Sequence, residues 1–133
     1  MLIATWNVNS VRTRLSQVIK WINAVNPDII CLQETKVVDE DFPFKPFEDL
    51  GYHVIVYGQK SYNGVAIISR LKGEKIIKGF GSETEGSDNL KEFIEQKRLI
   101  STVINGLRII NVYVPNGSSL DSEKFIYKIK WLK

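Results

Sequence analysis

Two polar side chains that could bind a metal ion follow two apolar segments of the chain. Asn7 comes directly after the apolar residues at the N-terminus, and Glu34 follows the run 29–32 and Gln33. An amide oxygen and a carboxylate are hard ligands that suit Mg²⁺ or Mn²⁺, and Mg²⁺ often takes only one or two protein carboxylates plus water. A helix cap at Asn7 and an ordinary surface carboxylate at Glu34 explain the same residues without a metal.

Three further side chains could contact a phosphate oxygen. Lys36 lies two residues after Glu34, on the same side of an extended segment, while Arg98 precedes a strand-like run and Tyr113 ends one. A solvated lysine, a surface arginine and a half-buried tyrosine are the simpler explanations. The only histidine, His53, lies inside a strand-like run and is expected in the core, so a Ser-His-Asp hydrolase is poorly supported.

The elements that would bring Asn7 and Glu34 together form a strand–helix–strand unit. Residues 2–6 are typical of a strand, apolar residues recur at helical spacing over 11–25, and Pro27 prevents the helix from continuing. Crossovers of this length join parallel strands, whose carboxyl ends meet at one edge of the sheet. We therefore expect the two side chains to lie side by side at that edge, where ligands gather in α/β proteins.

The remainder of the chain is mostly strand-like. Residues 39–51 and 79–96 are expected to form loops, and a helix is expected over the last residues. Asn105-Gly106 between two apolar runs predicts a hairpin, because both turn positions need positive φ. Nothing interrupts the pattern, so 1–133 is predicted to be a single α/β unit. The expected strands are 53–57, 65–69, 75–78, 99–104 and 107–114.

Composition limits the class of protein without naming its function. The 133 residues are 44% hydrophobic and 25% charged, as in an ordinary globular domain. No apolar run approaches the ~20 residues that cross a bilayer, and the N-terminus lacks the features of a signal peptide. The single cysteine, Cys31, lies in an apolar run, so we expect core packing in a reducing compartment and a cytoplasmic location. A net charge of +3 permits an anionic partner.

Five segments together resemble the exodeoxyribonuclease III family of bacterial DNA repair enzymes, within the endonuclease/exonuclease/phosphatase superfamily. They occur in the family's order and span essentially the whole chain. They are Ala-Thr-Trp-Asn-Val-Asn-Ser at 4–10, Asp-Ile-Ile-Cys-Leu-Gln-Glu-Thr-Lys at 28–36, Gly-Gln-Lys at 58–60, Asn-Gly-Val-Ala at 63–66 and Asn-Val-Tyr-Val-Pro-Asn-Gly at 111–117.

The resemblance implies a role for each candidate residue. Asn7 and Glu34 match the family's metal-binding positions, and Tyr113 matches an active-site tyrosine that contacts the scissile phosphate. The family uses Mg²⁺ or Mn²⁺ to cleave duplex DNA 5′ to abasic sites and to remove nucleotides from 3′ ends. The remaining matches line the groove for phosphate and DNA: Lys36, Arg98 and Asn116.

The chain also departs from the family's pattern. Members are longer, and their second half carries a Gly-Asp-x-Asn segment and an Asp-His pair; the first orients the attacking water. Neither Asp-x-Asn nor Asp-His occurs here. The resemblance therefore implies an N-terminal fragment of a DNase I-like four-layer α/β sandwich, with a mixed sheet and flanking helices, that is inactive alone. It also implies an uncovered apolar sheet face through which the fragment would self-associate.

Two other functions remain open at this point. One is a phosphatase of the same superfamily that acts on a lipid or inositol phosphate. The other is a non-catalytic remnant that binds DNA weakly and without a metal. Duplex DNA and inositol phosphates offered to a full-length protein would separate the phosphatase from the nuclease, and a salt-dependent but Mg²⁺-independent shift of duplex DNA would favour the remnant.

Overall fold

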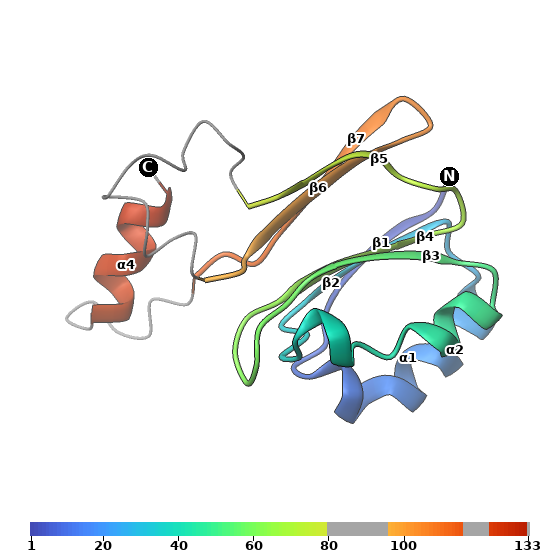
Figure 1. The fold of residues 1–133 in the computed structure, drawn as a ribbon, viewed down its shortest axis with the longest axis horizontal. Helices are drawn as coiled ribbons and strands as arrows, with labels where there is room; N and C mark the ends of the chain where they lie inside the picture. The colour runs from blue at the N-terminus through green and yellow to red at the C-terminus, as the bar shows by residue number, and fades with distance from the viewer. Residues whose placement is uncertain (80–95, 116–122, 133) are drawn as a thin grey trace.

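The computed structural model describes residues 1–79, 96–115 and 123–132, which form two stacked sheets with helices outside (Figure 1). Most of the expected loop 79–96 lies outside these residues. Among the described helices, none is long and apolar enough to cross a bilayer. In chain order the elements are β1 (Ile3–Asn7), α1 (Val11–Val25), β2 (Ile29–Gln33), the 3₁₀ turn η1 (Asp39–Asp41), α2 (Phe44–Asp49), β3 (His53–Tyr57), β4 (Val65–Ser69), β5 (Glu74–Lys78), β6 (Leu99–Ile104), β7 (Leu107–Val112) and α4 (Glu123–Leu132).

The larger sheet has the strand order β1-β2-β4-β3, and the smaller sheet has the order β5-β6-β7. β1 pairs with β2 in parallel, whereas β4 pairs with β2 and β3 in antiparallel fashion, so the larger sheet is mixed as predicted. The smaller sheet is antiparallel, and Asn105 and Gly106 join β6 to β7 with φ of 51° and 77°. This is the hairpin that the dipeptide predicted.

The crossover helix α1 has side-chain and backbone caps at its ends. Ser10 Oγ accepts a hydrogen bond from the Thr13 N–H at 3.4 Å, which satisfies one free amide of the first turn. At the other end Asn26 adopts a left-handed conformation and donates its N–H to Ile22 O at 2.8 Å. The apolar stripe predicted over 11–25 packs on the larger sheet through Val11, Val18 and Ile22, whereas Val25 at its end is exposed.

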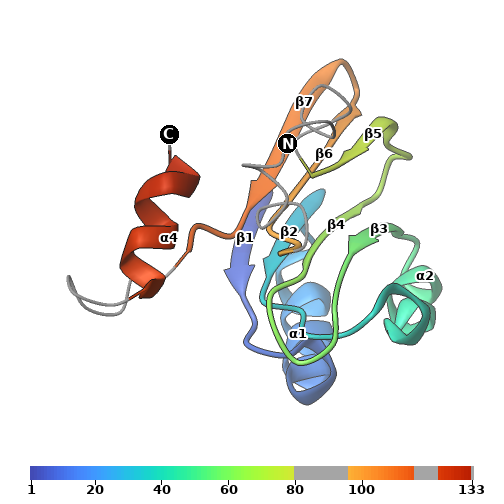
Figure 2. The ribbon, with the colours of Figure 1, turned by 60° about the vertical axis from the view of Figure 1, so that its left-hand side comes forward.

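Figures 1 and 2 show α1 and α2 on one face of the larger sheet and the smaller sheet on the other. The helix-facing side of the larger sheet packs on residues of both helices, including Val18, Ile22 and Phe47. The opposite side packs on the smaller sheet. We call that layer the inter-sheet core; its buried members are Ile29, Cys31, Val65, Ile67, Ile100, Ile104 and Ile109.

The sequence predicted an uncovered apolar face on one sheet, and the larger sheet does not have one. The hairpin of β6 and β7 lies over that face, and the side chains of Ile100, Ile104 and Ile109 fill the space between the sheets. Apolar exposure is found instead on the smaller sheet, where Ile110 is 61% exposed and Ile77 is 39% exposed. Both pair with Ser101 across β6, so they lie in one row on the outer face of the smaller sheet.

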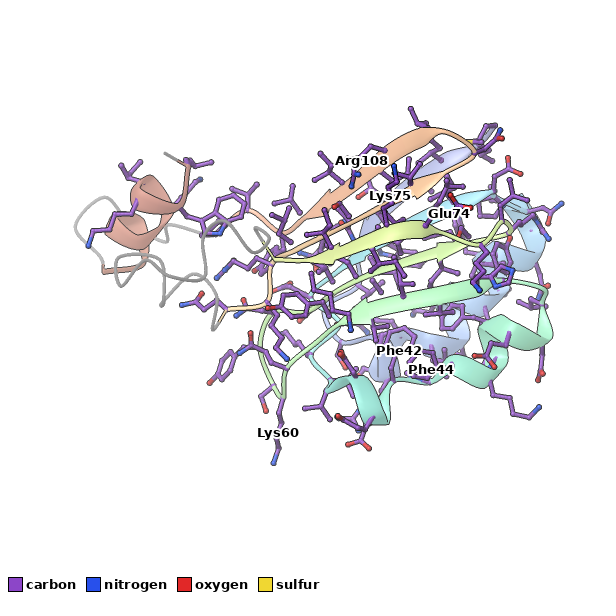
Figure 3. The ribbon with its side chains drawn as sticks, turned by 45° about the horizontal axis from the view of Figure 1, so that its top comes forward. Phe42, Phe44, Lys60, Glu74, Lys75 and Arg108 are labelled. Carbon is purple, nitrogen blue, oxygen red and sulfur yellow. The ribbon has the colours of Figure 1, made fainter. Side chains whose placement is uncertain are left out.

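Two further expectations about local structure are corrected. Residues 39–51 are not simply a loop, because they contain α2, in which Pro46 lies in the first turn, where a proline is tolerated, and Phe47 is fully buried. His53 is exposed rather than packed in the core, because β3 is an edge strand of the larger sheet. Phe42 lies just before α2 and Phe44 is its first residue, and both pack on the helix-facing core (Figure 3).

Candidate active site

The carboxyl ends of β1 and β2 meet at one edge of the larger sheet, as predicted. Asn7 is the register partner of Gln33, and the Val8 N–H donates to Gln33 O at 3.0 Å. Glu34 is the next residue after Gln33. The parallel pairing therefore places the expected amide and carboxylate on adjacent strand ends, Asn7 exposed and Glu34 half-buried.

The chain leaves β2 through a tightly bonded backbone segment. Glu34 has a φ of 56°, which is uncommon for a residue other than glycine and costs on the order of 1 kcal/mol or more. The Ser10 N–H donates to Glu34 O at 2.8 Å, and the Val11 N–H donates to Thr35 O at 3.1 Å. The start of α1 thus holds the residue that carries the carboxylate in an unfavourable backbone conformation.

The loop between β3 and β4 contacts this segment from its other side. Gly64 O accepts from the Thr35 N–H at 3.2 Å, and Asn63 O accepts from the Lys36 N–H at 2.9 Å. A Cβ on Gly64 would lie 2.2 Å from Thr35 Oγ1, and the φ of Gly64 is 93°. Only glycine fits this position without displacing its neighbours.

Tyr113 connects the smaller sheet to Glu34. Its hydroxyl donates to Glu34 Oε1 at 2.7 Å, a contact between residues 79 positions apart in sequence. Burial raises the pKa of the Tyr113 phenol, and the hydrogen bond to Glu34 and its negative charge raise it further, against a smaller lowering by Arg98. The phenol therefore stays protonated at neutral pH and remains a hydrogen-bond donor at the site.

Arg98 lies against Tyr113. Its guanidinium carbon is 4.8 Å from the centre of the tyrosine ring, and Nη1 donates to Tyr113 O at 3.4 Å. Arg98 Nε donates to Gln96 Oε1 at 3.1 Å, and the Tyr113 N–H donates to Arg98 O at 2.8 Å. The structure thus brings an arginine and a tyrosine hydroxyl to the edge that carries Glu34.

Lys36 is close to the site for a different reason from the one predicted. The segment after β2 is not extended, because Glu34 and Lys36 both have a φ of 56°. Lys36 Nζ instead donates to Asn9 Oδ1, and the Asn9 N–H donates to Asn7 Oδ1 at 3.2 Å. A chain of polar contacts therefore links the lysine to the expected amide ligand. Asn116 lies outside the described residues.

The donor set fits a hard divalent cation. Glu34 supplies a carboxylate with one oxygen accepting from Tyr113, and Asn7 Oδ1 accepts only one backbone N–H in the described contacts, which leaves a lone pair. Over residues 1–79, 96–115 and 123–132 no group of three or more His, Cys, Asp or Glu side chains is arranged to hold a metal. A lone carboxylate beside an amide suits Mg²⁺, which keeps several waters, better than zinc, which needs three or four protein ligands.

Sequence reasoning missed two buried amides behind the site. Gln33 and Asn111 are 9% and 2% exposed, and Gln33 Nε2 donates to Asn111 Oδ1 at 2.7 Å. Each amide follows an apolar residue in a strand. An amide within or at the end of an apolar strand could have indicated a buried polar side chain. Nothing in the local pattern indicates that the two residues are partners.

The stacked sheets, with helices on the outside of the larger one, and the polar groups at their common edge define half of a DNase I-like α/β sandwich. The chain belongs to the endonuclease/exonuclease/phosphatase family, whose sequence profile matches residues 4–117. The exodeoxyribonuclease III resemblance is confirmed as well. Relatives with that activity in their names match nearly the whole chain.

Exodeoxyribonuclease III of Haemophilus influenzae is 38% identical over 98% of this chain and 48% of its own length. An exodeoxyribonuclease of Bacillus subtilis is 32% identical over 98% of this chain and 49% of its own length. Among solved structures, an AP endonuclease from Archaeoglobus fulgidus is 47% identical, with a TM-score of 0.86 over 99% of this chain and 48% of that one. The 3′-5′ exonuclease NExo from Neisseria meningitidis is 41% identical, with a TM-score of 0.87 over 98% and 48%. The chain spans about half the length of these relatives.

Proposed function

We propose that this chain is the N-terminal half of a metal-dependent DNA repair nuclease that hydrolyses phosphodiester bonds. One contact carries the proposal: the 2.7 Å hydrogen bond from the Tyr113 hydroxyl to Glu34 Oε1 joins the two sheets at the edge where Asn7 also lies. Family membership over 4–117 and the DNA repair enzymes among the relatives support the reaction class.

In this proposal Glu34 and Asn7 hold a Mg²⁺ ion, which Mn²⁺ can replace. The ion, when bound, polarises a phosphoryl oxygen and stabilises the charge that develops on the leaving oxygen. Tyr113 has one hydroxyl proton, so it can donate to Glu34 or to a phosphate oxygen but not to both. Its raised pKa keeps that proton available at neutral pH.

Arg98 and Lys36 supply positive charge beside the scissile phosphate. The stacked guanidinium of Arg98 is held at the tyrosine ring, and Lys36 reaches the segment that carries Asn7. Donors fixed before the reaction stabilise the transition state without reorganisation. Asn116 is proposed as a further contact to DNA from its place in the matching motif.

Duplex DNA with abasic sites or 3′ ends is the proposed substrate. The names of the relatives include an AP endonuclease, a DNA-(apurinic or apyrimidinic site) endonuclease and a 3′-5′ exonuclease. Contacts to phosphate would dominate the affinity and make it depend steeply on salt, with little dependence on sequence. The chain alone is proposed to be inactive, because its sequence lacks the Asp-x-Asn and Asp-His patterns.

The test joins this chain to the second half of the A. fulgidus AP endonuclease, which is 47% identical over the shared part. We expect Mg²⁺-dependent incision of a duplex with one abasic site, loss of incision in Glu34→Gln, and no incision by the 133-residue chain. Inositol phosphates serve as the second substrate. Turnover of inositol phosphates without DNA incision would replace the nuclease with the phosphatase, and robust incision by the chain alone would contradict the partial site.

A further inference from the structure

Two buried amide side chains connect the larger sheet to the smaller one directly behind the site. Gln33 precedes Glu34 at the end of β2, and Asn111 lies two residues before Tyr113 near the end of β7. Gln33 Nε2 donates to Asn111 Oδ1 at 2.7 Å, although the residues are 78 positions apart. We call these two side chains the amide pair.

The amide pair contacts three strands of the larger sheet. Asn111 Nδ2 donates to Leu32 O at 2.9 Å and to Ala66 O at 2.8 Å, and these two residues are partners across β2 and β4. Gln33 Nε2 also donates to Thr5 Oγ1 on β1 at 2.8 Å. A single side chain of β7 is therefore tied to the larger sheet at one defined register.

The chemistry of the pair is unusual for its surroundings. The amides lie beside the inter-sheet core, whose buried members are apolar. Burying an amide is unfavourable unless its polar atoms are paired, and apolar side chains of similar size would fill the layer without that requirement. What the amides add is direction, because hydrogen bonds specify one relative placement of the two strands.

The position of the amide pair also determines the positions of Tyr113 and Glu34, which follow Asn111 and Gln33 closely in sequence. Asn111 and Tyr113 are two positions apart in an extended segment, so their side chains point to the same face. The Tyr113 hydroxyl donates to Glu34 Oε1 at 2.7 Å, and Glu34 follows Gln33 directly. The two amides, the tyrosine and the glutamate thus form a closed ring of covalent and hydrogen-bonded links.

We propose that Gln33 and Asn111 are positioning residues, which set the Glu34 carboxylate for its cation and the Tyr113 hydroxyl for a phosphate oxygen. The inference rests on the proposed function for the cation and the phosphate. The placement of Glu34 against Tyr113 is a property of the chain itself and can be tested separately. Removing a partner one step behind a metal ligand typically weakens metal binding about 10–100-fold.

The first test removes the amide of Asn111 by Asn111→Leu in the 133-residue chain. The control is Thr102→Val, because Thr102 is fully buried in the same sheet and its hydroxyl donates to Glu74 O at 2.8 Å away from the site. The readout is the nuclear Overhauser effect between the Glu34 γ-methylene and the Tyr113 ring. We expect it in the parent chain and in Thr102→Val, and we expect its loss in Asn111→Leu.

A milder variant keeps the test decisive. Gln33→Met removes the hydrogen bond to Asn111 but leaves the two bonds from Asn111 to the carbonyls of β2 and β4. This variant should weaken the same Overhauser effect while the backbone amide resonances remain dispersed, as in a folded protein. If Gln33→Met also unfolds, or if both variants fold and keep the Overhauser effect, the pair is merely structural and the proposal is overturned.

Mn²⁺ affinity provides the second readout, with Glu34→Gln as the site control. We expect binding about 10–100-fold weaker in Asn111→Leu and Gln33→Met than in Thr102→Val, measured under conditions where each variant is folded. Unchanged affinity in both variants would overturn the positioning role. A parent chain that binds no Mn²⁺ would refute the proposed metal site, whereas the Overhauser measurement would still decide whether the amide pair places Glu34.

Discussion

At the residue scale, the site depends on side chains whose partners are defined by short hydrogen bonds. Glu34 is held by Tyr113, Tyr113 is stacked under Arg98, and Asn7 is linked to Lys36 through Asn9. The contact between Glu34 and Tyr113 spans 79 positions and the one between Asn7 and Asn9 only two, but every side chain in these contacts is exposed or half-buried. Single substitutions at these positions should therefore alter chemistry more than folding.

Tyr113→Phe removes the hydroxyl and leaves the ring under Arg98. In the joined enzyme described above, kcat for abasic-site incision should fall about 100-fold with KM little changed, because the hydrogen bond strengthens as charge develops on phosphate. Tyr52→Phe is the matched control, since its hydroxyl donates to Pro27 O at 2.7 Å outside the site. Equal kcat values for the two variants would show that the Tyr113 hydroxyl does not contribute to catalysis.

Cys31 should make stability depend on pH in the alkaline range. Burial raises the pKa of its thiol from 9.0 to about 11, so the unfolded chain loses this proton first as the pH rises. The contribution of the protonated thiol to the free energy of unfolding is therefore fully present below pH 9. It is lost as the pH rises through 11, by about 3 kcal/mol. Urea unfolding from pH 8 to 11 should show a steeper loss for the parent than for Cys31→Ala; identical slopes would contradict the assignment.

At the element scale, local sequence patterns predict where helices and strands lie. They do not predict strand order, contacts between the sheets or the backbone conformation after β2. The spans of α1, β3, β4 and β6 agree with the sequence, because apolar periodicity and turn residues are local signals. The exposure of His53 depends on strand order, and the contact between Gln33 and Asn111 depends on sheet stacking, so neither is visible in a local pattern. The left-handed backbone conformations of Glu34 and Lys36 were not predicted, because glutamate and lysine are not residue types that indicate a positive φ.

The loop from β3 to β4 should be sensitive to substitution where it contacts the end of β2. Gly64→Ala should cost about 3 kcal/mol, since the new methyl group would lie 2.2 Å from Thr35 Oγ1 at a positive φ. Gly106→Ala is the control, with a similar φ of 77° and no atom within 4 Å, and should cost about 1 kcal/mol. Urea unfolding of both variants measures the difference, and equal losses would mean that the loop moves away freely.

At the scale of the whole molecule, the smaller sheet has one face that packs on the larger sheet and one face that carries exposed apolar side chains. Its inner face packs on the larger sheet, and its outer face carries exposed Ile110 and Ile77. Figure 3 shows Glu74, Lys75 and Arg108 on this sheet, so charged side chains accompany the apolar ones, and Lys60 lies far away on the loop after β3. Open apolar surface of this kind favours association.

The 133-residue chain should therefore self-associate through the outer face of the smaller sheet. Ile110→Lys should weaken the association at least about tenfold, because burial of one isoleucine contributes about 1.5–3 kcal/mol. Val25→Lys serves as the control, since Val25 is 39% exposed at the end of α1. Sedimentation velocity measures the effect. A parent chain that is monomeric at every concentration, unfolds cooperatively and binds no apolar dye would contradict this prediction.

The two proposed metal ligands lie at the ends of strands that differ in their position in the sheet: Asn7 is the last residue of β1, and Glu34 directly follows β2. β2 is an interior strand whose residues are all buried, whereas β1 lies at the margin of the sheet and pairs, within the described part of the chain, with β2 alone. Amide protons of an interior strand exchange slowly, while those at a margin open in frequent small fluctuations. In the proposed metal site, Glu34 would therefore be the more firmly held ligand, and Asn7 at the edge strand would be the more mobile one.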